Sequence, residues 1–177
     1  MAAADQIFTL SGVALGAIAS YLVGSLGERA RFRRELAKGW GDRKLDAYAG
    51  YIRDVKQVHM LAQRITAARG VHDRNIPLSP EEGLPLIAEA SVRRSLSSEQ
   101  VTLLASAETL ATLRRVNEEA RILMQFARGV SSSAEDFHQA IRSFTQALDD
   151  FHTCARSELG VPGTHLVRDN PAALPFP

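Results

Sequence analysis

An uncharged stretch of about 21 residues near the N-terminus constrains the fold of this chain more than any other feature. It runs from Ile7 to Gly27, and its most polar members are a threonine, three serines and a tyrosine. As an α-helix it would be roughly 31 Å long at about 1.5 Å per residue, which matches the hydrocarbon thickness of a bilayer. A helix in a soluble core rarely remains uncharged on every face over this length. We therefore predict a transmembrane helix over 7–27, preceded by a short segment over 1–6.

A cleaved secretory signal peptide is the alternative interpretation of this stretch. Ala17-Ile18-Ala19 has the small residues of a cleavage site, and the apolar run before it has a suitable length. However, signal peptides begin with a basic segment, whereas residues 1–6 contain no lysine or arginine and include Asp5. The apolar run also continues well beyond Ala19. We therefore prefer a retained helix, with cleavage as the alternative.

A basic segment follows directly and predicts the orientation of the chain. Between residues 28 and 44, seven basic side chains stand against three acidic ones, while residues 1–6 carry no basic side chain. Because basic residues remain on the cytoplasmic side, we predict a single-pass protein of the cytoplasmic (inner) membrane, with its N-terminus outside and its large domain in the cytoplasm. The segment 28–41 would form a juxtamembrane foot on anionic lipid headgroups. The headgroup contacts are assigned to Arg29, Arg31, Arg33, Arg34 and Lys38.

The charge balance argues against nucleic acid as a partner. The formal net charge is +1, of which residues 28–44 contribute +4 (seven cations less three anions), so the rest of the chain carries −3. A mildly acidic domain has no general attraction for nucleic acid. A nucleic-acid patch is the competing use of the basic segment itself, but the segment adjoins the predicted membrane helix, so the lipid bilayer is its expected partner.

Small residues recur at every fourth position along one face of the predicted membrane helix. In lipid, helices associate through close approach of their backbones, and a row of small side chains permits that approach. We predict that this row packs against a second copy of the chain or against another membrane protein. Its members are Gly12, Gly16, Ser20 and Gly24.

Residues 42–160 are predicted to form a helical bundle. Over 42–69, apolar residues alternate at spacings of three and four, Asp42 can cap the start, and Gly70 ends the pattern. This seam resembles that of a coiled coil and is suited to packing against other helices, including those of a partner. The seam residues with an expected interaction role are Leu45, Tyr48, Ile52, Val55 and His59.

Serine-initiated capping patterns divide the rest of the bundle. Ser79 precedes a proline and two glutamates, and Ser133 is followed three residues later by an aspartate, so each is expected to begin a helix. Similar patterns at Ser97 and Ser106 leave the helix boundaries between 79 and 107 open. The last two helices are expected over 107–128 and up to Gly160. Residues 161–177, which are rich in proline, are expected to be disordered. Without sustained strand alternation, the predicted fold is all-α: a transmembrane helix followed by an antiparallel bundle of about four helices.

Three short stretches carry a resemblance to other chains. They are ERARFRRE after the apolar segment, VTLLASAETLATLRR in the middle, and ARSELGVPG from Ala155 to Gly163. With them, the chain resembles a group of small single-span membrane proteins of actinobacteria, which combine an N-terminal apolar helix, an Arg-rich foot and a helical domain. That group has no assigned chemistry, so the resemblance implies no catalytic residue.

The residue types that carry catalysis are present but are not grouped in the sequence. His138 and His152 lie two heptads apart, roughly 21 Å along a helix, so they cannot bind one metal ion. The neighbouring acids Asp149 and Asp150 point about 100° apart and do not form a catalytic pair. Cys154 is the single cysteine and is expected to be a small core residue. Neither phosphate-binding glycine loops nor nucleophile elbows occur. We therefore predict no enzyme activity, cofactor, metal or small-molecule substrate.

The sequence favours a membrane-anchored, non-enzymatic interaction or scaffold protein that associates through its anchor and through the seam of 42–69. The alternative is a membrane-tethered sensor, in which the four helices bind a small ligand. That alternative expects a polar pocket that includes His59, Gln63 and His138.

Overall fold

The computed structural model describes residues 39–163. The predicted membrane helix over 7–27 therefore lies outside the described residues, as do its row of small residues, the five cations of the foot and most of the tail. Within 39–163, none of the helices has an apolar stretch long enough to cross a bilayer. The chain divides into two units at Arg43, and the bundle lies in the second unit, which begins at Lys44.

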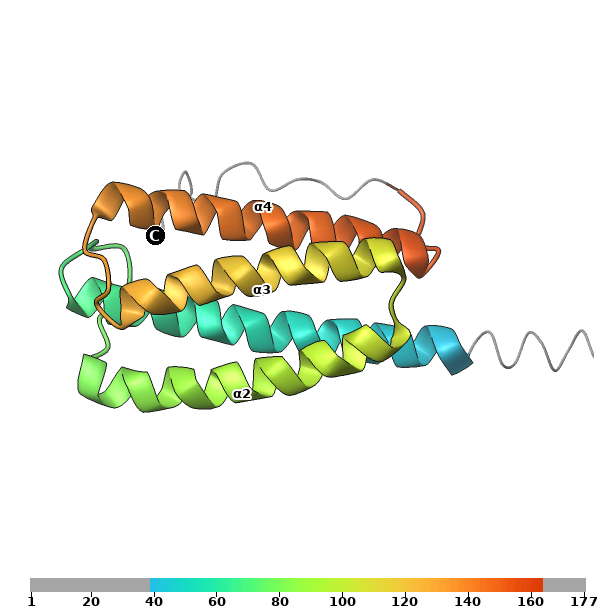
Figure 1. The fold of residues 1–177 in the computed structure, drawn as a ribbon, viewed down its shortest axis with the longest axis horizontal. Coiled ribbons are helices and arrows are strands. Elements are labelled where there is room, and N and C mark those ends of the chain that lie inside the picture. The colour runs from blue at the N-terminus through green and yellow to red at the C-terminus, as the bar shows by residue number, and fades with distance from the viewer. Residues whose placement is uncertain (1–38, 164–177) are drawn as a thin grey trace, which may run out of the picture. The chain divides into compact units, whose positions relative to one another are not determined.

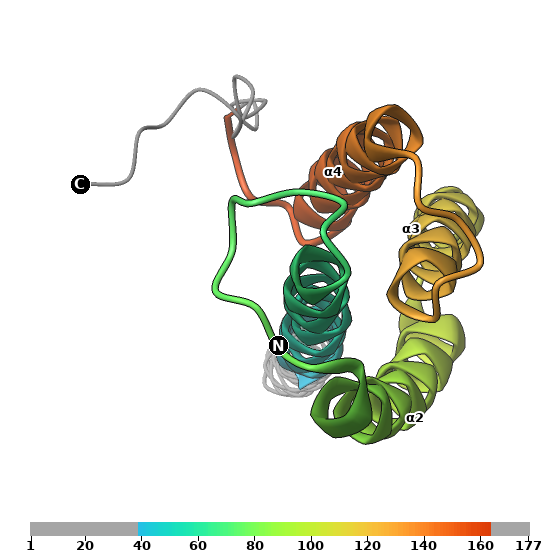
Figure 2. The same cartoon turned by 90° about the vertical axis from the view of Figure 1, so that its left-hand side faces the viewer.

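Four helices make up the described part of the chain, in agreement with the predicted all-α bundle. The first covers residues 39–68, and it is followed by α2 (Pro80–Leu104), α3 (Ala107–Ala127) and α4 (Ala134–Glu158). Successive helices run in opposite directions (Figure 1). Seen end-on, they follow one another around the bundle, so that the 39–68 helix has α2 on one side and α4 on the other (Figure 2).

Local capping sets the helix boundaries. The hydroxyl oxygens of Ser79, Ser106 and Ser133 each accept a hydrogen bond from the backbone N–H three residues later, at 3.2 to 3.3 Å. The starts predicted at Ser79 and Ser133 are confirmed, and Ser106, whose role the sequence left open, also caps a helix. Ser97, in contrast, lies buried inside the continuous α2 helix, where its hydroxyl bonds to the carbonyl oxygens of Arg93 and Arg94 at 3.2 and 3.1 Å. The segment between 79 and 107, whose helix boundaries the sequence left open, is thus one long helix, α2, followed by the start of α3 at its Ser106 cap.

Aromatic side chains from the 39–68 helix and α4 dominate the core. The ring of Phe151 packs edge-on against Tyr48 and Tyr51, with centroid distances of 5.8 and 5.3 Å. At the other end, Phe126 and Phe137 pack edge-on at 5.3 Å. Large buried rings and edge-to-face contacts contribute most of the apolar burial in such a core. The buried residues of α2 are smaller, and they are Gly83, Ile87, Ala90, Ser97 and Val101.

Close packing at Gly83 brings α2 against the 39–68 helix. A Cβ atom at this position would overlap Cγ1 of the fully buried Ile65 and would lie 2.7 Å from its Cδ1. Gly83→Ala is therefore expected to lower the free energy of unfolding by about 1–3 kcal/mol, although alanine is the better helix former. Chemical denaturation followed by circular dichroism measures this change.

Gly50 provides the matched control, because it is also a helical glycine but has open space around it. Its nearest neighbour to an added Cβ would be Nη2 of Arg53 at 4.0 Å. Gly50→Ala is expected to stabilise the chain by roughly 0.5–1 kcal/mol through helix propensity alone. If both substitutions change stability in the same direction, close packing at Gly83 is not the deciding factor.

Candidate functional site

The predicted seam of the 39–68 helix is turned largely into the bundle. Tyr48 and Val55 are buried, whereas Ile52 and His59 are half-buried and Leu45 is exposed. The His59 ring stacks on Phe144 with a centroid distance of 4.6 Å. Tyr48 and Val55 are therefore used by the chain's own core, and they are not available to a partner.

Glu158, the last residue of α4, gathers hydrogen bonds from three other parts of the bundle. Its two carboxylate oxygens accept from Lys44 Nζ at 2.5 Å, from the Tyr48 hydroxyl at 2.9 Å and from the Thr109 hydroxyl at 2.7 Å. The backbone N–H of Ser106 donates to the same carboxylate at 3.0 Å. The Glu158 side chain is only 13% exposed. This carboxylate thus ties the start of the bundle to the connection between α2 and α3.

The electrostatics of this cluster favour a permanently charged carboxylate. Burial alone would raise the pKa of Glu158, but the hydrogen bonds from Lys44, Thr109, the Ser106 N–H and Tyr48 outweigh it and lower the pKa to about 2. Burial and the neighbouring carboxylate raise the pKa of the Tyr48 phenol. A carboxylate with so low a pKa is a poor general base at neutral pH. What the cluster does in the bundle is to join the 39–68 helix, the α2–α3 connection and α4.

A second polar cluster surrounds Asn117 in the middle of α3. Its side-chain oxygen accepts from Arg94 at 2.8 Å and from the Tyr51 hydroxyl at 3.2 Å, and its amide nitrogen donates to Ser98 Oγ at 3.1 Å. Burial lowers the pKa of the Arg94 guanidinium. Three helices meet at one amide, so this network fixes their relative register.

Other side chains of the types used in catalysis either bond to the chain's own residues or lie apart from one another. Asp150 forms an ion pair with Arg115 at 2.8 Å and accepts from Gln146 at 2.9 Å. Burial and then the neighbouring Glu108 raise the pKa of the half-buried Cys154, which makes its thiol a weak nucleophile. In the part of the chain that the structure describes, no three His, Cys, Asp or Glu side chains are close enough to hold a metal ion.

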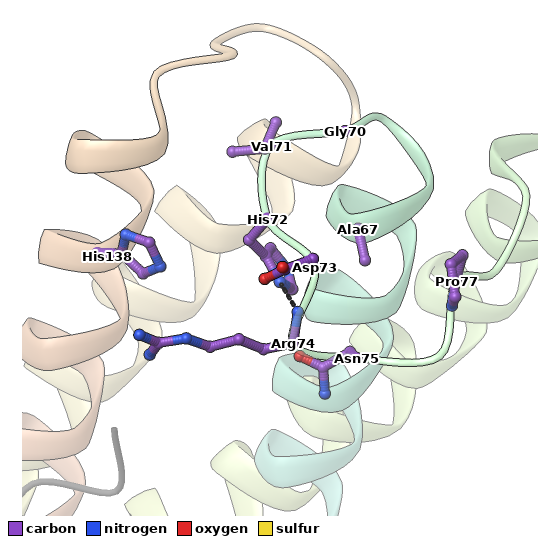
Figure 3. Close-up of a pocket in the computed structure, with 9 residues that line it drawn as sticks. All are labelled: Ala67, Gly70, Val71, His72, Asp73, Arg74, Asn75, Pro77 and His138. Atoms are coloured by element: carbon purple, nitrogen blue, oxygen red, sulfur yellow. Dashed lines mark hydrogen bonds between the residues drawn. The ribbon is translucent and has the colours of Figure 1, made fainter. Parts of the chain in front are cut away.

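A depression of about 650 Å³ lies where the connection over 69–79 meets the start of α4. His72 is one of its lining residues: the ring stacks on Phe137 with a centroid distance of 4.9 Å, and its Nδ1 accepts a hydrogen bond from the Arg74 N–H at 3.3 Å. Its Nε2 lies 3.0 Å from the Gln63 carbonyl oxygen, which fits a neutral ring with its proton on Nε2. Figure 3 shows the lining residues, which are Ala67, Gly70, Val71, His72, Asp73, Arg74, Asn75, Pro77 and His138.

The outer face of α2 carries an exposed apolar row, which the sequence did not single out. Pro85, Val92, Leu96 and Leu103 lie within about 40° of one another at 100° per residue, on the side opposite the buried residues. Val92 is 60% exposed, Leu96 64% and Leu103 83%. We call these four residues the α2 outer row.

Comparison with known proteins assigns no relative to this chain: no protein-family model, no curated protein and no solved structure matches it. Function must therefore be inferred from the residues themselves.

Proposed function

We propose that this chain is a membrane-anchored, non-enzymatic interaction protein that holds a four-helix bundle on the cytoplasmic side of the inner membrane. The observation that carries the proposal is the uncharged segment Ile7–Gly27 with seven cations in the 17 positions directly after it. The row from Gly12 to Gly24 would associate the anchor with a second copy or with another membrane protein. The basic foot would contact anionic headgroups.

The bundle supports a binding role over a catalytic one. In its two polar clusters, Glu158 and Asn117 form hydrogen bonds to other helices of the same bundle. The α2 outer row, in contrast, is left exposed. A bundle whose polar clusters join its own helices, and which leaves an apolar row exposed on α2, is suited to holding a partner.

Carbonate extraction of membranes tests the anchor. The full chain is expected to remain with the membrane pellet, because 7–27 would be integrated in the bilayer. Leu15→Arg places a charge at the middle of the segment, costs about 2.5–3.5 kcal/mol of insertion free energy, and should move much of the protein to the supernatant. Ala37→Arg adds the same charge to the foot and should leave the protein in the pellet. Release of the unmodified chain by carbonate would refute the anchor.

A small-ligand sensor is the second candidate, and the depression beside His72 favours it. Of the three residues expected in such a pocket, His138 lines the depression, whereas His59 stacks inside the bundle. The Gln63 carbonyl oxygen is engaged by His72. The sensor ranks second because the depression lies at one end of the bundle, and one of its two imidazoles is already bonded at both nitrogens.

A further inference from the structure

Large apolar side chains are exposed on two of the described helices. Within residues 39–163, three of them (Trp40, Leu45 and Met60) belong to the 39–68 helix and four to α2, whereas none belongs to α3 or α4. Three of the four, Val92, Leu96 and Leu103, lie in the α2 outer row, which extends over roughly 27 Å at about 1.5 Å per residue. A row of this length and periodicity matches the apolar face of another helix.

The charges that border the row restrict what can cover it. Glu81 and Glu99 flank it on one side, and Glu82 and Glu89 flank it on the other; all four are exposed. Arg93 is the single outward cation of α2, and it is paired with Glu89. Arg94 points inward to Asn117. The row is thus an apolar strip between two carboxylate borders.

We propose that the α2 outer row docks a cationic amphipathic helix of a partner protein. The apolar face of such a helix would cover Val92, Leu96 and Leu103, while its lysine or arginine side chains would meet the glutamate borders. A second copy of α2 would place glutamates opposite glutamates, and anionic lipid headgroups would meet the same repulsion. This inference rests on the interaction role proposed above and gives the chemical class of the partner.

Binding of a designed peptide tests the proposal on the full chain in nanodiscs of zwitterionic lipid. The probe is a fluorescent 18-residue helix with leucine on one face and lysine on the other; the same helix with glutamate in place of lysine is the charge control. Fluorescence anisotropy, with empty nanodiscs as background, should show binding of the lysine helix and at least tenfold weaker binding of the glutamate helix. Equal binding of the two helices would overturn the proposal.

Substitutions in the α2 outer row test whether the peptide binds there or elsewhere on the surface. Leu96→Gln and Leu103→Gln should each weaken binding of the lysine helix about tenfold, and Glu99→Gln should weaken it severalfold. Met60→Gln changes an apolar residue of similar exposure (56%) on the 39–68 helix, and it should leave binding within twofold. Circular dichroism verifies the fold of each variant. Unchanged binding in both leucine variants would refute the proposal, as would a dimer that Leu96→Gln dissociates in sedimentation. The carbonate-extraction test does not depend on peptide binding, so a failure to bind the peptide would not contradict the proposed membrane anchor.

Discussion

Replacing Glu158 with alanine is expected to lower the free energy of unfolding by about 3–5 kcal/mol. The substitution removes the acceptor shared by Lys44, Tyr48, Thr109 and the Ser106 N–H, and it leaves a lysine that is only 25% exposed without its counterion. Losing one partner of a largely buried ion pair is costly because the other charge remains out of water. Chemical denaturation at neutral pH measures the effect.

Glu89→Ala is the matched control for this prediction. Glu89 also pairs with an arginine, but its side chain is 67% exposed. An exposed pair contributes little, so the loss should stay below about 1 kcal/mol. Similar losses in the two variants would contradict the structural role of Glu158.

The same carboxylate should also make stability depend on pH. The pKa of Glu158 is about 2 in the folded chain, against an ordinary value of 4.5. A lowered folded pKa means that the stabilisation is complete above pH 4.5 and is lost as the pH falls from about 4.5 to about 2. Glu158→Ala should not show this loss.

The features that the sequence predicted well are those that depend on neighbouring residues. Ser79 and Ser133 cap helices through a backbone N–H three residues away, so the groups that interact lie within one short pattern. The helical periodicity of α3 and α4 could be recognised for the same reason, since each has apolar residues on one face only. The similar serine pattern at Ser97 lies inside α2, because tertiary packing continues the helix through it.

The polar clusters could not be predicted because their members are far apart in the chain. Glu158 is 49 residues from Thr109 and 114 from Lys44. No local pattern distinguishes it from any other glutamate near a helix end. Asn117 similarly joins Tyr51 and Arg94 across three helices.

The α2 helix shows a different limit of sequence interpretation. Its apolar residues lie on two opposite faces, so periodicity does not identify the face that is buried. Ile87 and Val101 point into the core, whereas Val92 and Leu96 point to solvent. The small residues Gly83 and Ala90 determine which face of α2 is buried, because they let the helix approach its neighbours closely. The burial of this face depends on tertiary packing, and it leaves the α2 outer row exposed.

Mild acid is expected to destabilise the bundle before Glu158 becomes protonated, and His59 is the cause. Its ring is stacked on Phe144, and its Nε2 has no hydrogen-bond partner among the described residues. Burial, and then the nearby charge of Lys56, lower the pKa of His59 from 6.5 to about 4. Because the unfolded chain binds the proton more readily, stability is complete above pH 6.5 and falls as the pH drops towards 4. The loss attributable to His59 amounts to about 3 kcal/mol.

Substitution by an aromatic residue without a titratable group isolates this effect. His59→Phe keeps a ring against Phe144 but cannot take up a proton, so the free energy of unfolding should decline less steeply between pH 6.5 and 4 than in the unmodified chain. The slopes should differ by about 1.4 kcal/mol per pH unit, which corresponds to one proton. His72, whose pKa burial also lowers, remains in both chains and contributes equally to each slope. Parallel curves for the two chains would mean that His59 takes up its proton as readily in the bundle as in the unfolded chain, and that its place in the core carries no electrostatic cost.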